Sequence, residues 1–197
     1  MKNRISFKMT WANRISIGRI LLIPVFVFLL NECQKWSSFF QFLPLQVFII
    51  AASLDVLDGY LARKNNEVTS LGSILDPLAD KLLMITVLFI FVFRNKSLFY
   101  ASIPPVLFYM VLLREIILIL GAGILILFNK KLIVKPRFVG KVATFLQVLL
   151  IASVLAGFKQ SVIFFLTVPA CLFVFISLIF YILDGVRQIA RKEGAAD

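Results

Sequence analysis

The sequence predicts an all-helical protein that crosses a membrane six times, and three observations lead to this prediction. Of the 197 residues, 61% are hydrophobic and the mean hydropathy is +0.99, values that are typical of polytopic membrane proteins. Apolar stretches of about 20 residues, the length that crosses a bilayer as a helix, recur along the chain. Basic residues flank these stretches. We therefore expect a single membrane domain over residues 1–197.

The first half of the expected fold consists of a surface segment and three spans. Residues 1–13 are basic and include Trp11, so we expect an amphipathic helix that lies on the membrane interface. The first span covers about residues 15–34 and the second covers 41–62, and each is bounded by charged or polar residues. The third span covers residues 73–93 and contains charged residues only in its first turns.

Three further spans make up the second half. The fourth covers about residues 99–128, and it is long enough to tilt in the membrane or to break near Gly121 and Gly123. The fifth covers 140–157 and follows a basic loop, and the sixth covers 161–184. No repeat or separate soluble domain is visible between the spans.

The distribution of basic residues predicts the orientation of the helices. The chain has 21 basic and 10 acidic residues and a net charge of +11. In a soluble protein this charge would suggest nucleic acid, but here the basic residues border apolar spans, so we expect contacts with anionic lipids and no nucleic acid. Fifteen basic residues fall on one side, which also holds both ends of the chain, and four fall on the other. We therefore expect both termini in the cytoplasm and the protein in the cell (inner) membrane.

Four carboxylates gather near the cytoplasmic ends of the second and third spans. Asp55 and Asp58 are three residues apart, and Asp76 and Asp80 are four apart, so each pair lies on one helix face. The connection 63–72 is short, which makes the two helices antiparallel neighbours and brings the four acids to one depth. Carboxylates are costly within a membrane and need positive charge, but the chain has no histidine and few basic residues nearby.

Bound divalent metal is the simplest compensation, because hard oxygen ligands suit Mg2+ or Mn2+. Two metal ions bridged by the carboxylates would fit phosphoryl transfer, since such a pair stabilises both the entering and the leaving oxygen. One carboxylate should accept the proton of an alcohol nucleophile, and Asp80 is the best candidate because it lies farthest along its helix. The alternative that the acids only form ion pairs fits poorly, because they outnumber the local cations.

Small and basic residues accompany the acids in a pattern that suits a phosphate ligand. Gly59 and Ala62 permit close approach of a helix or a flat ligand. Gly72 opens the third span, where free backbone N–H groups and the positive end of the helix dipole favour phosphate. Arg63 lies at the mouth of the site and suits a forked contact with phosphate.

At these residues the sequence resembles the CDP-alcohol phosphotransferase family, whose signature is Asp-x2-Asp-Gly-x2-Ala-Arg-x8-Gly-x3-Asp-x3-Asp. All fixed positions match, at Asp55, Asp58, Gly59, Ala62, Arg63, Gly72, Asp76 and Asp80. The resemblance implies transfer of a phosphatidyl-type group from a CDP-linked lipid to an alcohol, with release of CMP, and two divalent cations. It implies metal ligation by all four aspartates, with Asp80 also acting as the base. It further implies a nucleotide pocket formed by Asp58, Gly59, Ala62, Arg63 and Gly72.

Outside the signature the chain resembles the bacterial phosphatidylglycerophosphate synthase branch, over residues 13–16, 75–81, 114–115 and 140–144. This likeness implies CDP-diacylglycerol as donor and glycerol 3-phosphate as acceptor. Two positions depart from the branch: Ala12 replaces a usual proline, and Ala143 replaces a common second lysine. Alternatives therefore stay open: phosphatidylglycerol as acceptor, giving cardiolipin, or inositol phosphate. A cation transporter is a remote alternative, since the acids cluster at one membrane face instead of the midplane.

A phosphorylated acceptor requires cations to bind it. The candidates are Arg114 in the fourth span, and Lys135, Arg137 and Lys141 at the loop into the fifth. Arg114 could instead pair with Glu115, but neighbours in sequence point to different helix faces, so we expect this direct pairing to be weak. The family resemblance also makes a homodimer one option.

Overall fold

The computed structural model describes residues 11–32, 42–53, 72–94, 101–127 and 138–190, and for residues 11–17, 19, 72–80, 94, 122–127 and 187–190 it describes the backbone alone. These residues form helices, joined where described by short turns and coil, and no strand occurs among them. In chain order, the labelled elements are α1 (Trp11–Glu32), α3 (Gly72–Phe89), the π-helical turn η3 (Ile90–Arg94), α4 (Pro105–Leu127), α5 (Phe138–Leu155) and α6 (Gln160–Ala190). A further helix covers Leu43–Ser53 between α1 and α3. The predicted all-helical class is confirmed for this part of the chain.

Among the described residues, two helices are long and apolar enough to cross a membrane. They cover Phe138–Leu155 and Gln160–Val186, with mean hydropathies of 2.0 and 2.8. Shorter apolar stretches lie at Ile20–Glu32, Leu43–Ser53 and Lys81–Phe93. The expected surface segment falls largely on residues 1–10, outside the described residues, and α1 begins at Trp11.

The fourth expected span forms one continuous helix. The break that we considered near Gly121 and Gly123 does not occur, because α4 runs through both glycines to Leu127. Leucine and isoleucine flank the glycines, and these residues fit an uninterrupted hydrogen-bonded helix better than a kink. The helix begins at Pro105, where the missing proline N–H costs little.

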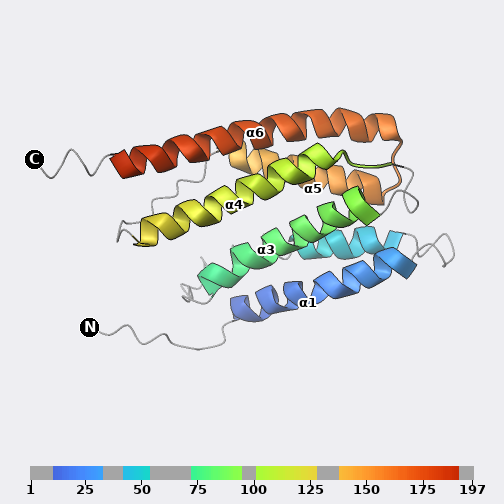
Figure 1. The fold of residues 1–197 in the computed structure, drawn as a ribbon. Helices are drawn as coiled ribbons and strands as arrows, with labels where there is room; N and C mark the ends of the chain where they lie inside the picture. The colour runs from blue at the N-terminus through green and yellow to red at the C-terminus, as the bar shows by residue number, and fades with distance from the viewer. Residues whose placement is uncertain (1–10, 33–41, 54–71, 95–100, 128–137, 191–197) are drawn as a thin grey trace, which may run out of the picture.

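The helices lie roughly side by side in Figure 1, with α1 against α3 and α6 against both α4 and α5. The core between them is apolar and includes Leu88, Leu107, Leu150 and Ile163, which are all fully buried. Phe26 of α1 and Phe48 of the helix Leu43–Ser53 meet with ring centroids 6.2 Å apart, so this short helix packs on α1. Together these contacts hold α3, α4, α5 and α6 around one shared interior.

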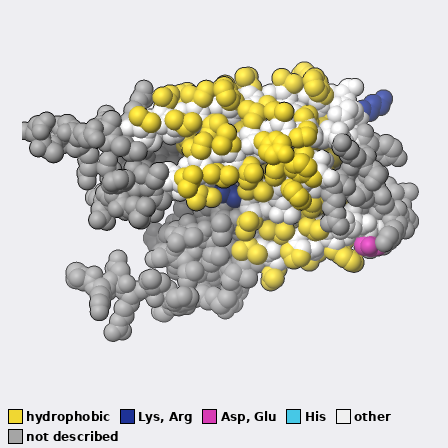
Figure 2. All heavy atoms as spheres, in the orientation of Figure 1, with side chains coloured by type: hydrophobic (Ala, Val, Ile, Leu, Met, Phe, Trp, Pro, Cys, Tyr) yellow, Lys and Arg dark blue, Asp and Glu magenta, His cyan; other side chains and the backbone are white. Residues whose placement is uncertain are grey.

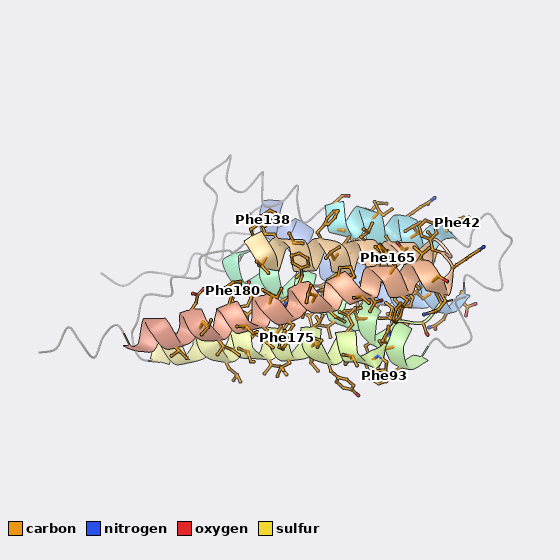
Figure 3. All side chains as sticks on the ribbon, turned by 90° about the horizontal axis from the view of Figure 1, so that it is seen from above. Phe42, Phe93, Phe138, Phe165, Phe175 and Phe180 are labelled. Carbon is orange, nitrogen blue, oxygen red and sulfur yellow. The ribbon has the colours of Figure 1, made fainter. Side chains whose placement is uncertain are left out.

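The exterior of the bundle is also apolar. Figure 2 shows hydrophobic side chains over most of the described surface on one face. Phenylalanines labelled in Figure 3 come from several helices, and Phe138, Phe165 and Phe175 are exposed. Contiguous apolar surface of this extent is unfavourable in water and is typical of helices that contact lipid.

Candidate functional site

A pocket with a volume of about 160 Å3 lies between α3, α4, α5 and α6. More than half of its lining side chains are polar or charged, which is unusual in so apolar a bundle. The polar group consists of Lys81, Arg114, Glu115, Thr144, Gln147 and Tyr181. The rest of the lining consists of Met84, Ile85, Val111, Leu118 and Gly140.

One buried carboxylate in this pocket is shared by two cations. The Arg114 Nε donates to Glu115 Oε1 at 2.9 Å, and the Arg114 Nη2 contacts the same oxygen. The Lys81 Nζ of α3 lies 2.7 Å from Glu115 Oε2 as an ion pair. Arg114 and Glu115 are only 7% and 5% exposed, whereas the Lys81 side chain is 30% exposed. The three charges leave one positive charge in surplus, and this charge suits an anionic ligand.

The expectation that direct pairing of Arg114 with Glu115 would be weak is wrong. The rule that adjacent residues face apart holds for short side chains, but the arginine side chain is long enough to bring its guanidinium back to the neighbouring carboxylate. Lys81 from α3 holds the second oxygen of that carboxylate in place. The pairing does not remove Arg114 from the candidate acceptor site, because Arg114 and Glu115 line the same pocket.

The helices α5 and α6 also line the pocket. Gln147 is 1% exposed, and its Nε2 has no hydrogen-bond acceptor among the residues that the structure describes. The Thr144 hydroxyl donates to the Gly140 carbonyl oxygen at 3.2 Å, so its proton is used within the helix. A Cβ placed on Gly140 would lie 2.9 Å from the Tyr181 hydroxyl, so the glycine leaves room for the end of the Tyr181 side chain at the pocket.

The face of α3 that carries two of the signature aspartates continues into the pocket. The helix begins at Gly72, as predicted. Asp76, Asp80 and Met84 follow one another at intervals of four, so they lie along one helix face. Met84 lines the pocket, and Asp80 lies about 6 Å before it along the helix axis. The backbone of α3 therefore places residue 80 about one turn before the pocket-lining Met84.

Several predicted site residues fall outside the described residues. These are Asp55, Asp58, Gly59, Ala62 and Arg63 in 54–71, and Lys135 and Arg137 in 128–137. Lys141 is described: it is exposed on the first turn of α5 and directly follows Gly140 of the pocket. Among the described side chains, no group of three or more acids, histidines or cysteines could hold a metal ion. Because the side chains of the four aspartates are not among them, their convergence stays a prediction.

Sequence reasoning predicted only Arg114 among the polar residues of the pocket and missed Lys81, Glu115, Thr144, Gln147 and Tyr181. Glu115 entered only as an unfavoured partner of Arg114, although it joins α3 to α4. Gln147 was overlooked, yet a single amide in the apolar helix Phe138–Leu155 was a visible signal. For Tyr181, near the end of α6, the sequence offers no comparable signal, since tyrosines often lie at a membrane boundary.

Comparison with known proteins identifies the family to which the chain belongs. Residues 9–173 match the family model described as CDP-alcohol phosphatidyltransferase. The chain belongs to this family. Its apolar helices and the family together indicate a membrane-embedded enzyme.

Named relatives extend the likeness over nearly the whole chain. An Aquifex aeolicus protein is 30% identical over 186 residues, which cover 91% of this chain and 98% of the relative. A Rickettsia felis protein is 33% identical over 175 residues, covering 88% and 90%. Both are named CDP-diacylglycerol–glycerol-3-phosphate 3-phosphatidyltransferase. A human protein named cardiolipin synthase (CMP-forming) is 36% identical over 165 residues, covering 75% of this chain and 50% of that protein.

Proposed function

We propose that this protein transfers the phosphatidyl group of CDP-diacylglycerol to glycerol 3-phosphate, giving phosphatidylglycerophosphate and CMP. The observation that carries the proposal is the pocket whose Lys81–Glu115–Arg114 cluster, with Lys81 partly exposed, has a surplus positive charge beside the aspartate-bearing face of α3. Such a charge suits the phosphate of a small acceptor. The end-to-end similarity to relatives with the corresponding name supports the same activity.

The donor would bind through the signature residues. Asp58, Gly59, Ala62 and Arg63 would hold the nucleotide, and free backbone N–H groups at Gly72 would favour its diphosphate. Its acyl chains would lie between helices in the cytoplasmic leaflet.

The oxygen donors of Asp55, Asp58, Asp76 and Asp80 fit hard divalent cations, and two such ions, when bound, would polarise the phosphoryl oxygens. The place of Asp76 and Asp80 on one face of α3 agrees with this donor set.

The reaction itself would depend on Asp80. Its carboxylate would accept the proton of the acceptor's primary hydroxyl. The oxygen would attack the phosphorus that bears diacylglycerol, the bond from this phosphorus to the CMP oxygen would break, and CMP would leave. Catalysis would arise from positioning and charge stabilisation, with no covalent enzyme intermediate.

The acceptor phosphate would bind to basic residues. Arg114 lines the pocket, and Lys141 lies one residue beyond its Gly140 wall. Lys135 and Arg137 precede α5 by only a few residues and belong to the same proposed group. A phosphomonoester held here would have its hydroxyl end directed toward Asp80.

The membrane arrangement belongs to the same proposal. It comprises six spans, an interfacial helix over residues 1–13, both termini in the cytoplasm, and an active site that faces the cytoplasm at the cell (inner) membrane. The distribution of basic residues supports this orientation, and the apolar exterior supports contact with lipid. The proposal is compatible with a monomer or a homodimer.

Cardiolipin synthesis is the second candidate, because a cardiolipin synthase is among the relatives and Ala143, which is fully buried, replaces the common lysine. To separate the two activities, purified protein is incubated with CDP-diacylglycerol, Mg2+ or Mn2+, and either glycerol 3-phosphate, phosphatidylglycerol or inositol phosphate. We expect mass spectrometry to detect phosphatidylglycerophosphate and CMP with the first acceptor. Cardiolipin alone would refute the proposed acceptor, and ion flux in vesicles without CMP release would indicate a transporter.

A further inference from the structure

Gln147 is a buried polar residue for which the described structure offers no partner. It lies in the middle of the apolar helix α5 and is 1% exposed, and its Nε2 has no hydrogen-bond acceptor among the described residues. An amide donor that stays unpaired in the interior destabilises a protein, so nearly all such groups have a partner. A ligand in the pocket that Gln147 lines would supply the missing acceptor.

Gln147 comes from a different helix than the charged part of the pocket. Gly140, Thr144 and Gln147 follow at intervals of four and three, so they form one stripe on α5, whereas the charged cluster belongs to α3 and α4. The Thr144 proton is already used by the Gly140 carbonyl, whereas the Gln147 donor is not engaged. The pocket therefore has a cationic wall and a wall with a neutral donor.

We propose that Gln147 is a specificity-determining residue whose side-chain amide donates a hydrogen bond to the acceptor hydroxyl that does not react. Cations match a phosphate, and a neutral amide matches an alcohol oxygen, which brings no charge to balance. Glycerol 3-phosphate has a phosphate, a reacting primary hydroxyl and one further polar group, its secondary hydroxyl. The inference rests on the proposed function, and it assigns this secondary hydroxyl to Gln147.

The test compares glycerol 3-phosphate with 3-hydroxypropyl phosphate, which keeps the phosphate and the primary hydroxyl but lacks the secondary hydroxyl. For the wild-type protein we expect kcat/KM to be roughly 10- to 100-fold lower with the analogue, because the Gln147 donor then stays unpaired. In Gln147→Met, a variant of similar length without the donor, we expect turnover of glycerol 3-phosphate to fall toward that of the analogue. In this variant the ratio of kcat/KM for glycerol 3-phosphate to kcat/KM for the analogue should approach one.

The analogue also reports on the folding of each variant, because its turnover does not depend on the proposed bond. The matched control is Ser153→Ala, which changes another buried polar residue of α5 that bonds to the Leu149 carbonyl and does not line the pocket. It should keep the wild-type preference. Equal losses with both acceptors in Gln147→Met, or no preference in the wild type, would overturn the assignment of Gln147 alone. Absence of phosphatidylglycerophosphate from the wild type would overturn the proposed function and this inference with it.

Discussion

The two ends of the α3–α4 pair differ in the side chains that join them: charged ones at one end, and at the other aromatic ones of which only Phe108 is buried. At one end the rings of Phe89, Phe93, Phe108 and Tyr109 form a cluster, with the Phe93 centroid 5.2 Å from Phe89 and 5.3 Å from Phe108. At the other end the same two helices bury a cluster of charges around Glu115. Both clusters join the helices, but they do so at very different energetic cost.

This difference between the two ends suggests that the aromatic end serves stability and the charged end serves function. An aromatic pair contributes about 0.5–1.5 kcal/mol beyond its buried area. A buried ion pair, in contrast, often contributes less than well-packed apolar side chains of the same volume, because the charges lose their hydration. The charged end is therefore a poor way to stabilise a bundle and a good way to bind an anion. The following predictions test this division.

The largest effect should come from Asp80 at the charged end. We expect Asp80→Asn to lower kcat by about 10²- to 10⁴-fold, because the proposed base is lost while the shape of the side chain is kept. CMP release from CDP-diacylglycerol measures the effect, and thermal unfolding in detergent checks the fold. Asp184→Asn, which changes an acid of α6 outside the pocket lining, serves as control. Normal turnover in Asp80→Asn would refute the assignment of the base.

Glu115→Gln should produce the largest loss of stability. The change leaves Arg114 and Lys81 without their shared counter-charge, and we expect the free energy of unfolding to fall by about 3 kcal/mol, since Lys81 is partly exposed and keeps some hydration. Chemical unfolding in detergent micelles measures the loss.

The triple change Lys81→Met, Arg114→Met and Glu115→Leu sharpens the comparison, because it replaces the whole cluster with apolar side chains. It should restore stability to near the wild-type value and still abolish acceptor turnover. A triple variant as unstable as Glu115→Gln would show that the cluster is structural.

Arg114→Gln should change acceptor binding more than donor binding. Removal of the guanidinium cancels the surplus positive charge of the cluster, so we expect KM for glycerol 3-phosphate to rise roughly 10- to 100-fold. KM for CDP-diacylglycerol should change little. The matched control is Lys159→Gln, which removes an exposed cation between α5 and α6. An equal rise of both KM values would contradict the role of Arg114 at the acceptor.

Hydropathy was sufficient to predict the helices of the second half of the chain. The fifth expected span, 140–157, and the sixth, 161–184, correspond to Phe138–Leu155 and Gln160–Ala190. The start of α3 at Gly72 was also predicted, because the signature places a glycine before the apolar run. These features depend on local composition, which the sequence shows directly.

The pocket could be predicted only in part, because it depends on packing between helices. The sequence indicated that Arg114 is a functional residue, since an arginine within an apolar span is energetically costly. It could not show that Lys81 of α3 meets Glu115 of α4, or that Gln147 lines the same pocket. The periodicity of a single helix does not show how that helix is rotated relative to its neighbours. The pairing of Arg114 with Glu115 was misjudged for another reason, because the long arginine side chain lets the guanidinium reach the adjacent carboxylate.

The smallest effect should come from the aromatic end. We expect Phe93→Leu to lower the free energy of unfolding by about 0.5–1.5 kcal/mol, because Phe93 loses its contacts with three neighbouring rings. Turnover and both KM values should stay at the wild-type level. Phe165→Leu is the matched control, since Phe165 is 76% exposed and its replacement should change stability less. Chemical unfolding measures the stability of both variants, and CMP release from the same preparations measures their turnover. A drop in kcat without a matching loss of stability would mean that the aromatic end acts on the active site, and the two ends of the α3–α4 pair could then no longer be treated as separate.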